Sequence, residues 1–271
     1  MVEKADMTTE KGTLSPFDGY FDVAGRTAFI AGAYGDIGAA IAGALVANDV
    51  RIAIAGRNEA KLSELASRLG DRAAPVVLDA SDVGSIRNAV DAAAVSLGGI
   101  DFFVNSVGIF EEERLLDATP ESFDRVTAVN YRAAMFLGQA VARVQVAQGT
   151  RGGRHVHLLS VRAQLGMRDR GYSSYSGSKG GLVMLVRQHA LELAPHGITV
   201  NGVAPTVVRT AMAEHWYADP VKREKLLARI PLGRIAEVDD VAGVVLFFLA
   251  PASSFVTGQV LYLDGGITIS Q

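Results

Sequence analysis

The sequence predicts an α/β fold, a doubly wound, mostly parallel sheet of about seven strands with helices on both faces. Two observations indicate this. Short apolar segments alternate with helical segments from Arg26 almost to the end of the 271 residues, which favours right-handed βαβ units and a sheet covered on both faces. The sequence also shows no internal repeat and no linker, so we predict a single domain.

Seven short runs rich in Val, Ile, Ala and aromatic residues predict the strands. Several are apolar at nearly every position, which is typical of parallel strands buried on both faces. The predicted strands are residues 26–32, 50–56, 74–79, 100–108, 154–160, 197–205 and 258–266.

Helices are predicted between these runs, where apolar residues recur with helical spacing. Gly70 closes the second helix, and Ser81 or Asp82 caps the third. The predicted helices are residues 36–48, 58–70, 81–98, about 120–148, 172–194 and 241–250. A strand-and-helix alternation of this kind is typical of Rossmann-type domains.

Two segments depart from the alternation. Residues 1–20 are polar, and we predict a tail that orders only against a neighbour. Residues 21–271 form the predicted domain, and within it residues 205–234 form a long irregular stretch that holds Trp216, the only tryptophan. Long insertions of this kind often cover a binding site, so this segment is predicted to be a lid.

Composition excludes several classes of protein. The chain is 49% hydrophobic and 20% charged with a net charge of −3, which argues against a disordered chain and a nucleic-acid binder. No leader is visible at the N-terminus, and the most apolar run, 241–250, is too short to cross a bilayer. We therefore expect a soluble, cytoplasmic protein that binds neither membranes nor nucleic acids.

Metal and thiol chemistry are not expected. The chain has no cysteine, so disulfides and thiolate catalysis are excluded. His155 and His157 share one face of a predicted strand, but no third ligand accompanies them. They are predicted to be packing residues.

The sequence YSGSK, Tyr175 to Lys179, predicts acid–base chemistry. Residues four apart on a helix lie on the same face. A lysine ammonium beside a phenol favours the phenolate and lowers its pKa. The pair is therefore predicted to exchange protons near neutral pH.

A glycine-rich turn, AGAYGDIG from Ala31 to Gly38, joins the first predicted strand to the first helix. Glycines at such a turn allow the backbone to approach a pyrophosphate, and the helix N-terminus offers free amides. Alone, the turn is equally consistent with a tight strand-to-helix connection.

Taken together, the turn and YSGSK resemble the short-chain dehydrogenase/reductase family, and the resemblance extends from about Val23 to the end of the chain. The family's turn reads T-G-x-x-x-G-x-G, and Gly32 and Gly38 match its first and third glycines. Asp36 stands at the middle glycine, with Gly35 one residue earlier. Its carboxylate is compatible with nearby phosphates if it points outward, as a helix N-cap does.

Further family motifs follow in the expected order. NSVG from Asn105 resembles the family's N-N-A-G, and APTVVRT resembles its P-G-x-x-x-T, with Thr206 in place of the glycine. The other matching positions are Asp79 after the third strand, Asn130 in the long helix, Ser160 after the fifth strand and Thr210.

The resemblance implies a role for each catalytic candidate. Tyr175 would give or take the proton, and Lys179, together with an oxidised nicotinamide, would lower its pKa. Ser160 would donate a hydrogen bond to the substrate oxygen, and Asn130 would position a water that links Lys179 to solvent. The resemblance places the cofactor against Gly32, Tyr34, Asp36, Ile37, Gly38, Arg57, Asp79, Ala80, Asn105, Gly108, Tyr175, Lys179, Pro205, Val208 and Thr210.

The end of the second strand bears on the choice of cofactor. An acidic residue there would bind the adenosine ribose hydroxyls and favour NAD, but Gly56 and Arg57 occupy this position. A guanidinium can bind a 2′-phosphate, so NADP is the predicted cofactor. NAD is not excluded, because the turn lacks a further basic residue and Asp36 adds negative charge.

Arginines near Ser160 and in the lid suggest a substrate. Arg162, Arg209 and His215 are the candidate substrate contacts, and they would suit a carboxylate such as that of a sugar acid. The alternative is that these side chains face water or a neighbouring subunit.

The sequence thus predicts an NADP(H)-dependent oxidoreductase that interconverts a secondary alcohol and a ketone, on a polyol or a sugar acid. One alternative is a 3-oxoacyl thioester reductase, which would need a more open and apolar lid. Another is a non-catalytic dinucleotide-binding sensor or scaffold, which would have no need for the Tyr175 phenol. By resemblance we also expect a homotetramer.

Overall fold

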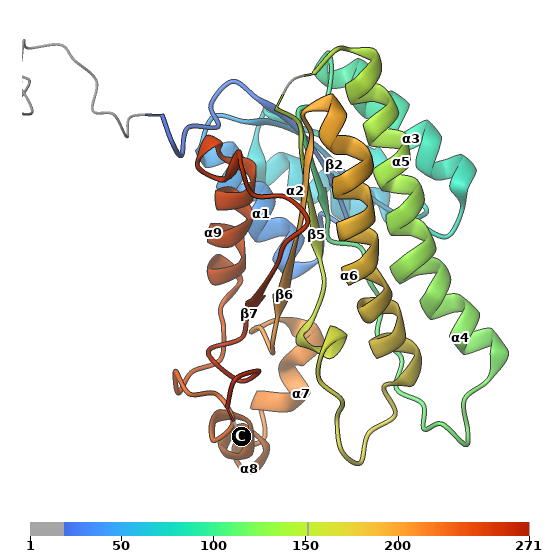
Figure 1. Cartoon of the computed structure of the whole chain (residues 1–271), viewed down its shortest axis with the longest axis vertical. Coiled ribbons are helices and arrows are strands. Elements are labelled where there is room, and N and C mark those ends of the chain that lie inside the picture. The colour runs from blue at the N-terminus through green and yellow to red at the C-terminus, as the bar shows by residue number, and fades with distance from the viewer. Residues whose placement is uncertain (1–18, 151, 271) are drawn as a thin grey trace, which may run out of the picture.

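The centre of the molecule is one parallel sheet, seen in a computed structural model that describes residues 19–150 and 152–270 (Figure 1). Seven strands pair in the order β3-β2-β1-β4-β5-β6-β7, so the predicted fold class is confirmed. The strands are β1 Thr27–Ala31, β2 Arg51–Gly56, β3 Ala73–Val77, β4 Phe102–Asn105, β5 Arg154–Leu158, β6 Thr199–Pro205 and β7 Val260–Leu263.

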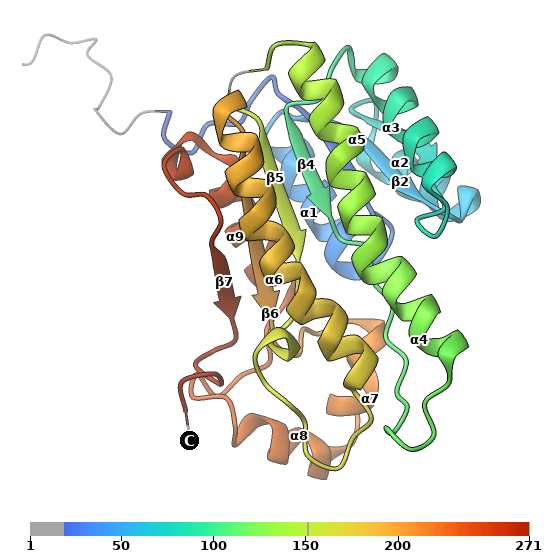
Figure 2. The same cartoon turned by 45° about the vertical axis from the view of Figure 1, so that its right-hand side comes forward.

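Helices cover both faces of this sheet. On one face lie α1 Asp36–Ala47, α2 Glu59–Leu69 and α9 Val238–Leu249, and their apolar residues share a core with the sheet. The other face is covered by α3 Val83–Leu97, α5 Ala133–Ala147 and α6 Ser173–Leu193. Figures 1 and 2 show α9 on the opposite side of the sheet from α5 and α6.

The central strands are buried on both faces, as their apolar sequences predicted. Every residue of β1, β4 and β5 is buried. Because burial of each large apolar side chain contributes about 1.5–3 kcal/mol, the sheet is the main source of stability and a rigid base for the loops at its ends.

The long helical stretch predicted over residues 120–148 is not one regular helix. Helix α4 Pro120–Thr127 passes into a π-helical turn, η1 Ala128–Arg132, before α5 begins. Such turns are rare overall, and those that occur are often found at functional sites. Helical periodicity could not reveal it, because one extra residue per turn hardly changes the apolar pattern.

The irregular stretch 205–234 contains short helices beyond the carboxyl ends of the strands (Figure 2). They are η4 Ala211–Ala213, α7 Glu214–Tyr217 and α8 Pro220–Leu227. Between β5 and α6 lies a further short helix, η2 Val161–Ala163.

The predicted N-terminal tail falls, through residue 18, outside the described residues. Within residues 19–150 and 152–270, none of the helices has the length and apolar character needed to cross a membrane.

Candidate active site

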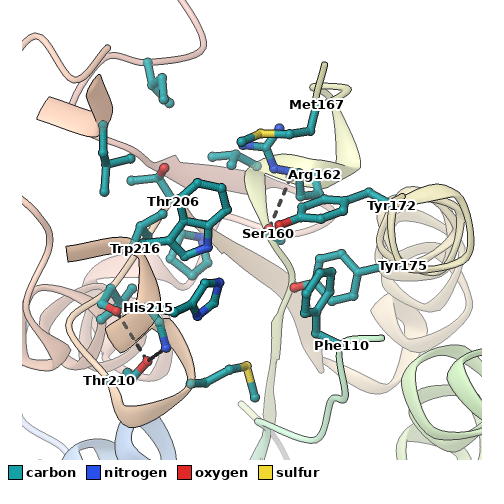
Figure 3. Close-up of a pocket in the computed structure, with 18 of the residues that line it drawn as sticks. Phe110, Ser160, Arg162, Met167, Tyr172, Tyr175, Thr206, Thr210, His215 and Trp216 are labelled. Carbon is teal, nitrogen blue, oxygen red and sulfur yellow. Dashed lines mark hydrogen bonds between the residues drawn. The ribbon is translucent and has the colours of Figure 1, made fainter. Parts of the chain in front are cut away.

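A cavity of about 410 Å³ lies where the carboxyl ends of the strands meet the short helices α7 and α8. Ligands of open α/β sheets bind at this edge. Ser160 and Tyr175 line one side of the cavity, and His215 and Trp216 line the opposite side (Figure 3).

Ser160 is positioned by the end of β5 and the start of η2. Its Oγ accepts a hydrogen bond from the backbone N–H of Arg162 at 3.2 Å, so it caps η2. The hydroxyl hydrogen is left free to donate elsewhere. Burial raises the pKa of the Tyr175 phenol, and a hydrogen bond with Ser160 opposes this rise, so the two hydroxyls face the same space.

Lys179 lies one helical turn beyond Tyr175 in α6, as the spacing predicted. Its Nζ is 5.8 Å from the centroid of the Tyr175 ring and donates to the Leu158 carbonyl at 2.9 Å. The side chain is only 4% exposed, and burial lowers the Lys179 pKa to about 8.

The causes that shift the pKa of Tyr175 do not include Lys179, so the lowering that the resemblance assigns to Lys179 together with an oxidised nicotinamide stays a prediction. The pKa of the phenol is raised, and burial is the largest cause. The lysine ammonium lies near the face of the ring and contacts the Leu158 carbonyl. At neutral pH Tyr175 is therefore protonated and can donate a proton.

Asn130 lies in the π-helical turn and is fully buried. Its Oδ1 accepts from Ile109 N at 2.8 Å, and its Nδ2 donates to Ile109 O at 2.9 Å and to Ser178 Oγ at 3.1 Å. A Cβ on Gly108 would lie 3.4 Å from Lys179 Nζ and 3.6 Å from Asn130 Oδ1. Asn130 thus joins the loop after β4 to α6 beside the lysine.

The glycine turn is shaped for close backbone approach. Gly32 has a φ of +79°, and a Cβ there would lie 2.8 Å from the backbone of Ser106. A Cβ on Gly38 would overlap the Gly32 carbonyl. The N-cap of α1 is Gly35, whose lack of a side chain leaves the helix's first amides uncapped. This turn fits the pyrophosphate of a dinucleotide.

Asp36 is not the N-cap of α1, the position in which its carboxylate would point away from the phosphates. Gly35 is the N-cap, and Asp36 is the first helical residue. Its Oδ2 accepts from the backbone N–H of Ala211 at 2.7 Å. The carboxylate therefore links the glycine turn to the start of η4. The two residues are 175 positions apart, so no local sequence pattern could predict this contact.

The last residue of β2, at the position where an acidic side chain would favour NAD, is a glycine. A Cβ on Gly56 would overlap the Tyr34 ring, so the tyrosine fills that space. Lys61 lies 5.8 Å from the centroid of the same ring. Arg57 is exposed, and it helps to lower the pKa of Asp79, although hydrogen bonds from Ser81 are the main cause.

The remaining cofactor candidates follow successive strands at the same edge of the sheet. Ala80 and Asp79 come after β3, and Asn105 ends β4, where its Nδ2 lies 3.3 Å from His157 Nδ1. Pro205 ends β6. Ile37, Pro205, Val208 and Thr210 all line the cavity, and Thr210 caps η4.

The structure separates the three substrate candidates. Arg162 and His215 line the cavity, whereas Arg209 does not. Arg209 donates from Nε to Glu237 Oε1 at 2.9 Å and stacks over the Tyr217 ring. Its charge is thus already paired outside the cavity.

Several lining residues were missed from the sequence. They include Phe110, Met167, Tyr172, Trp216, Lys222, Lys225 and Arg229. A helical signal was available for the last three, because residues 222, 225 and 229 recur at i, i+3 and i+7 and share a face. The aromatic residues carry no pattern that separates lining from packing.

No group of three or more histidine, aspartate or glutamate side chains placed to hold a metal ion is found in the described part of the chain. His155 and His157 are buried, and burial lowers the pKa of both.

Comparisons with known proteins agree with this geometry. A family model described as enoyl-(acyl carrier protein) reductase matches residues 32–268. Human L-xylulose reductase is 38% identical over 245 residues, covering 90% of this chain and 97% of the relative.

Solved structures agree as well. A gluconate 5-dehydrogenase from Burkholderia cenocepacia, in complex with NADP and tartrate, has a TM-score of 0.88 at 32% identity and covers 93% of this chain and 99% of its own. A short-chain type dehydrogenase/reductase from Mycobacterium marinum has a TM-score of 0.85 at 31% identity, with coverages of 93% and 98%.

Proposed function

The chain is an oxidoreductase of the short-chain dehydrogenase/reductase family, and from this premise we propose that it uses NADP(H) to interconvert a secondary alcohol and a ketone on a polyol or sugar acid. The observation that carries the proposal is the meeting of Ser160 and Tyr175 at one cavity, with Lys179 next along the helix. The relatives named for xylulose and gluconate support the substrate class.

The residues divide the chemistry of carbonyl reduction. A bound NADPH supplies the hydride. Ser160 donates its hydroxyl hydrogen to the substrate oxygen and stabilises the negative charge that develops there. Tyr175 donates the proton, and its raised pKa keeps that proton available at neutral pH. In the oxidation direction Tyr175 must first lose its proton, which favours alkaline conditions.

Lys179 and Asn130 support this proton transfer. Lys179 is held by the Leu158 carbonyl close to the ring, and its pKa of about 8 lets it exchange protons near physiological pH. Asn130 fixes the loop at Ile109 that lies beside it. We infer that Lys179 reprotonates Tyr175, with Asn130 as a positioning residue.

The preference for NADP rests on the end of β2. Tyr34 occupies the space over Gly56 that an acidic side chain would need, and Arg57 offers a guanidinium beside it. Since no salt bridge of the described residues includes Arg57, its charge is free to bind a 2′-phosphate.

We further propose that the enzyme is a homotetramer. Exposed apolar side chains gather on the helices that cover one face, α4 to α6: Phe123, Tyr131, Met135, Val146, Met184 and Leu191. Monomeric proteins rarely expose so many, so this surface suits a second copy of the chain.

The variant Tyr175→Phe tests the catalytic proposal. Removal of the phenolic hydroxyl should leave NADPH binding unchanged and reduce turnover by about 10²–10⁴-fold, since the proton donor is lost. Tyr131→Phe, the same change in the π-helical turn, serves as the control. Binding is measured by NADPH fluorescence and turnover by absorbance. Unchanged turnover in Tyr175→Phe would exclude the mechanism, and a wild type that binds NADPH without any turnover would favour a sensor or scaffold.

A further inference from the structure

Four basic side chains line the cavity without any acidic residue to balance them. They are Arg162 from η2 and Lys222, Lys225 and Arg229 from α8 and the turn after it. The rest of the lining is apolar, aromatic or uncharged, with His215 beside Trp216. A cavity with four cations and no carboxylate has a positive potential that attracts anions.

Arg162 is the most buried of these four cations, and one edge of its guanidinium already makes hydrogen bonds. Its Nη1 donates to the carbonyls of Leu165 and Gly166, at 3.3 and 2.8 Å. No acceptor among the described residues takes its Nε or Nη2. Since an arginine side chain binds carboxylate or phosphate through two parallel N–H groups, the free edge is a prepared donor pair.

The surroundings of Arg162 make the charged form of its guanidinium energetically unfavourable. The side chain is half-buried, and the guanidinium lies 5.9 Å from the centroid of the Tyr172 ring. Burial and the nearby Arg229 both lower its pKa. A half-buried cation that faces a second cation lacks a counter-charge, and a bound anion would supply one.

The cations of α8 lie on the cavity side of that helix. Lys222, Lys225 and Arg229 line the cavity, while Arg223 on the same helix does not. Arg229 approaches Met167, with its Nη1 3.9 Å from the Met167 sulfur. Asp219 caps the helix through its backbone amides and does not neutralise them.

Three other arginines near this region are paired. Arg170 bonds Glu112, Arg209 bonds Glu237 and Arg234 bonds Asp240. In the described part of the chain, no salt bridge includes Arg162, Lys222, Lys225 or Arg229. The four cations that line the cavity therefore have no ion-pair partner among the described residues.

We propose that these four side chains form an anion subsite, and that the substrate is a short polyhydroxy chain ending in a carboxylate or phosphate. Arg162 holds the anionic group through Nε and Nη2, and Arg229, Lys222 and Lys225 close over it. This rests on the proposed function, because it places the reactive carbon at Ser160 and Tyr175. Ser160 and Arg162 are two residues apart, and the backbone N–H of Arg162 donates a hydrogen bond to Ser160 Oγ. The residue that binds the reactive end of a small substrate and the residue that binds its anionic end are therefore fixed relative to each other.

A neutral polyol satisfies this site less well. Its hydroxyls can accept hydrogen bonds from Arg162, but they leave the positive charges without a counter-charge once the lid excludes water. A charge-assisted bond is roughly twice as strong as a neutral one. The subsite therefore discriminates acids from the corresponding alcohols.

The test compares three probes with the same six-carbon chain: sorbitol, D-gluconate and sorbitol 6-phosphate. Each is titrated calorimetrically into the NADP⁺-loaded protein, and turnover is followed in parallel. The variants are Arg162→Gln and Arg229→Gln, and Arg223→Gln, on α8 but outside the cavity lining, is the control for the loss of one positive charge. Because Arg162 also affects the pKa of Tyr175, the readout is the ratio of anionic to neutral probe.

We expect an anionic probe to bind about 10- to 100-fold more tightly than sorbitol, and each lining variant to remove most of this preference. Arg223→Gln should keep it. If only gluconate binds more tightly than sorbitol, the subsite is specific for a carboxylate. If only sorbitol 6-phosphate does, the subsite is specific for a phosphate.

Equal binding of all three probes, or a preference that survives both lining variants, overturns the anion subsite. Turnover of sorbitol in that case still upholds the proposed function. Conversely, tight binding of an anionic probe without turnover of any alcohol or ketone upholds the subsite and counts against the proposed reaction.

Discussion

Tyr175 shows how a single residue takes its properties from its surroundings. From the sequence, Lys179 was expected to lower the pKa of the phenol. In the structure, burial raises that pKa, and the hydrogen bond to Ser160 opposes it only in part. The spacing of the two residues was correctly predicted from the helix period, but the balance of burial against charge depends on long-range packing.

The pKa shifts of Tyr175 and Lys179 predict opposite pH dependences for the two reaction directions. Reduction needs a protonated Tyr175, whose raised pKa keeps it protonated at neutral pH, and a charged Lys179, whose pKa of about 8 means that its proton is lost above that pH. We expect kcat/KM for reduction to fall above about pH 8, and kcat/KM for oxidation to rise with pH.

The measurement is a pair of pH profiles with one alcohol and its ketone. Lys179→Arg stays charged but cannot release a proton, so it should lower kcat/KM for reduction across the whole pH range and remove the decline near pH 8. A reduction optimum at alkaline pH in the wild type would show that a charged Lys179 is not needed for proton donation.

Arg57 carries the predicted cofactor preference. Arg57→Ala removes the only guanidinium proposed to bind the 2′-phosphate, so the dissociation constant for NADPH should rise by about 10- to 100-fold, while that for NADH changes little. Arg68→Ala, an exposed arginine at the end of α2, is the control. Fluorescence titration with both nucleotides measures the effect. If wild type prefers NADH, Arg57 is a surface residue and the enzyme is an NAD-dependent dehydrogenase.

At the scale of elements, each strand was predictable, because a run of apolar residues bounded by turns has few other solutions in an α/β chain. The helix ends were also visible: Gly70 is the C-cap of α2, and Asp82, one of the two predicted candidates, caps α3 through its side chain. The π-helical turn that holds Asn130 was not, since its signal is one extra residue per turn. The short helices α7 and α8 were missed because they are only one or two turns long, and their few apolar residues pack into a small cluster shared with η2 and β7.

The contact between Asp36 and Ala211 predicts that the glycine turn restrains residues 205–234, the proposed lid. Asp36→Ala removes the acceptor, so the segment that begins at η4 should open more often. The lid itself contains trypsin sites at Lys222, Arg223, Lys225 and Arg229. An exposed hydrogen bond of about 0.5–1.5 kcal/mol corresponds to about 2- to 12-fold faster cleavage there.

Asp36→Asn is the matched control, because it keeps a side-chain oxygen for Ala211 and loses only the charge. It should be cleaved at nearly the wild-type rate. Equal cleavage of wild type and Asp36→Ala would mean that the contact does not restrain the lid. Added NADPH should slow cleavage of all three if the lid closes over the cofactor.

For the whole molecule, the sheet explains why candidate residues that lie far apart in the sequence come together. Residues far apart in the chain meet at one edge because every parallel strand ends there, and so Asp79, Asn105, Ser160 and Pro205 each follow or end a strand. The cations of the cavity could not be assigned in the same way. Arg209 and Arg229 both lie in the lid sequence, and only folding pairs one with Glu237 and turns the other to the cavity.

Assembly is the last property that the surface predicts. A groove between α5 and α6 is lined by Met135 and Val146 among others, and Met184 and Leu191 on α6 are 58% and 72% exposed. If a second copy covers this face, sedimentation should give a multiple of the 28.6 kDa chain, four-fold for the proposed tetramer.

Met184→Glu with Leu191→Glu would bury two charges in such an interface and should shift the mass to smaller species. The same two changes at Leu115 and Leu116, which are also exposed but lie outside these helices, should leave the mass unchanged. A wild type that sediments as one chain would refute the proposal, and the catalytic residues, all from one chain, would then act in a monomer.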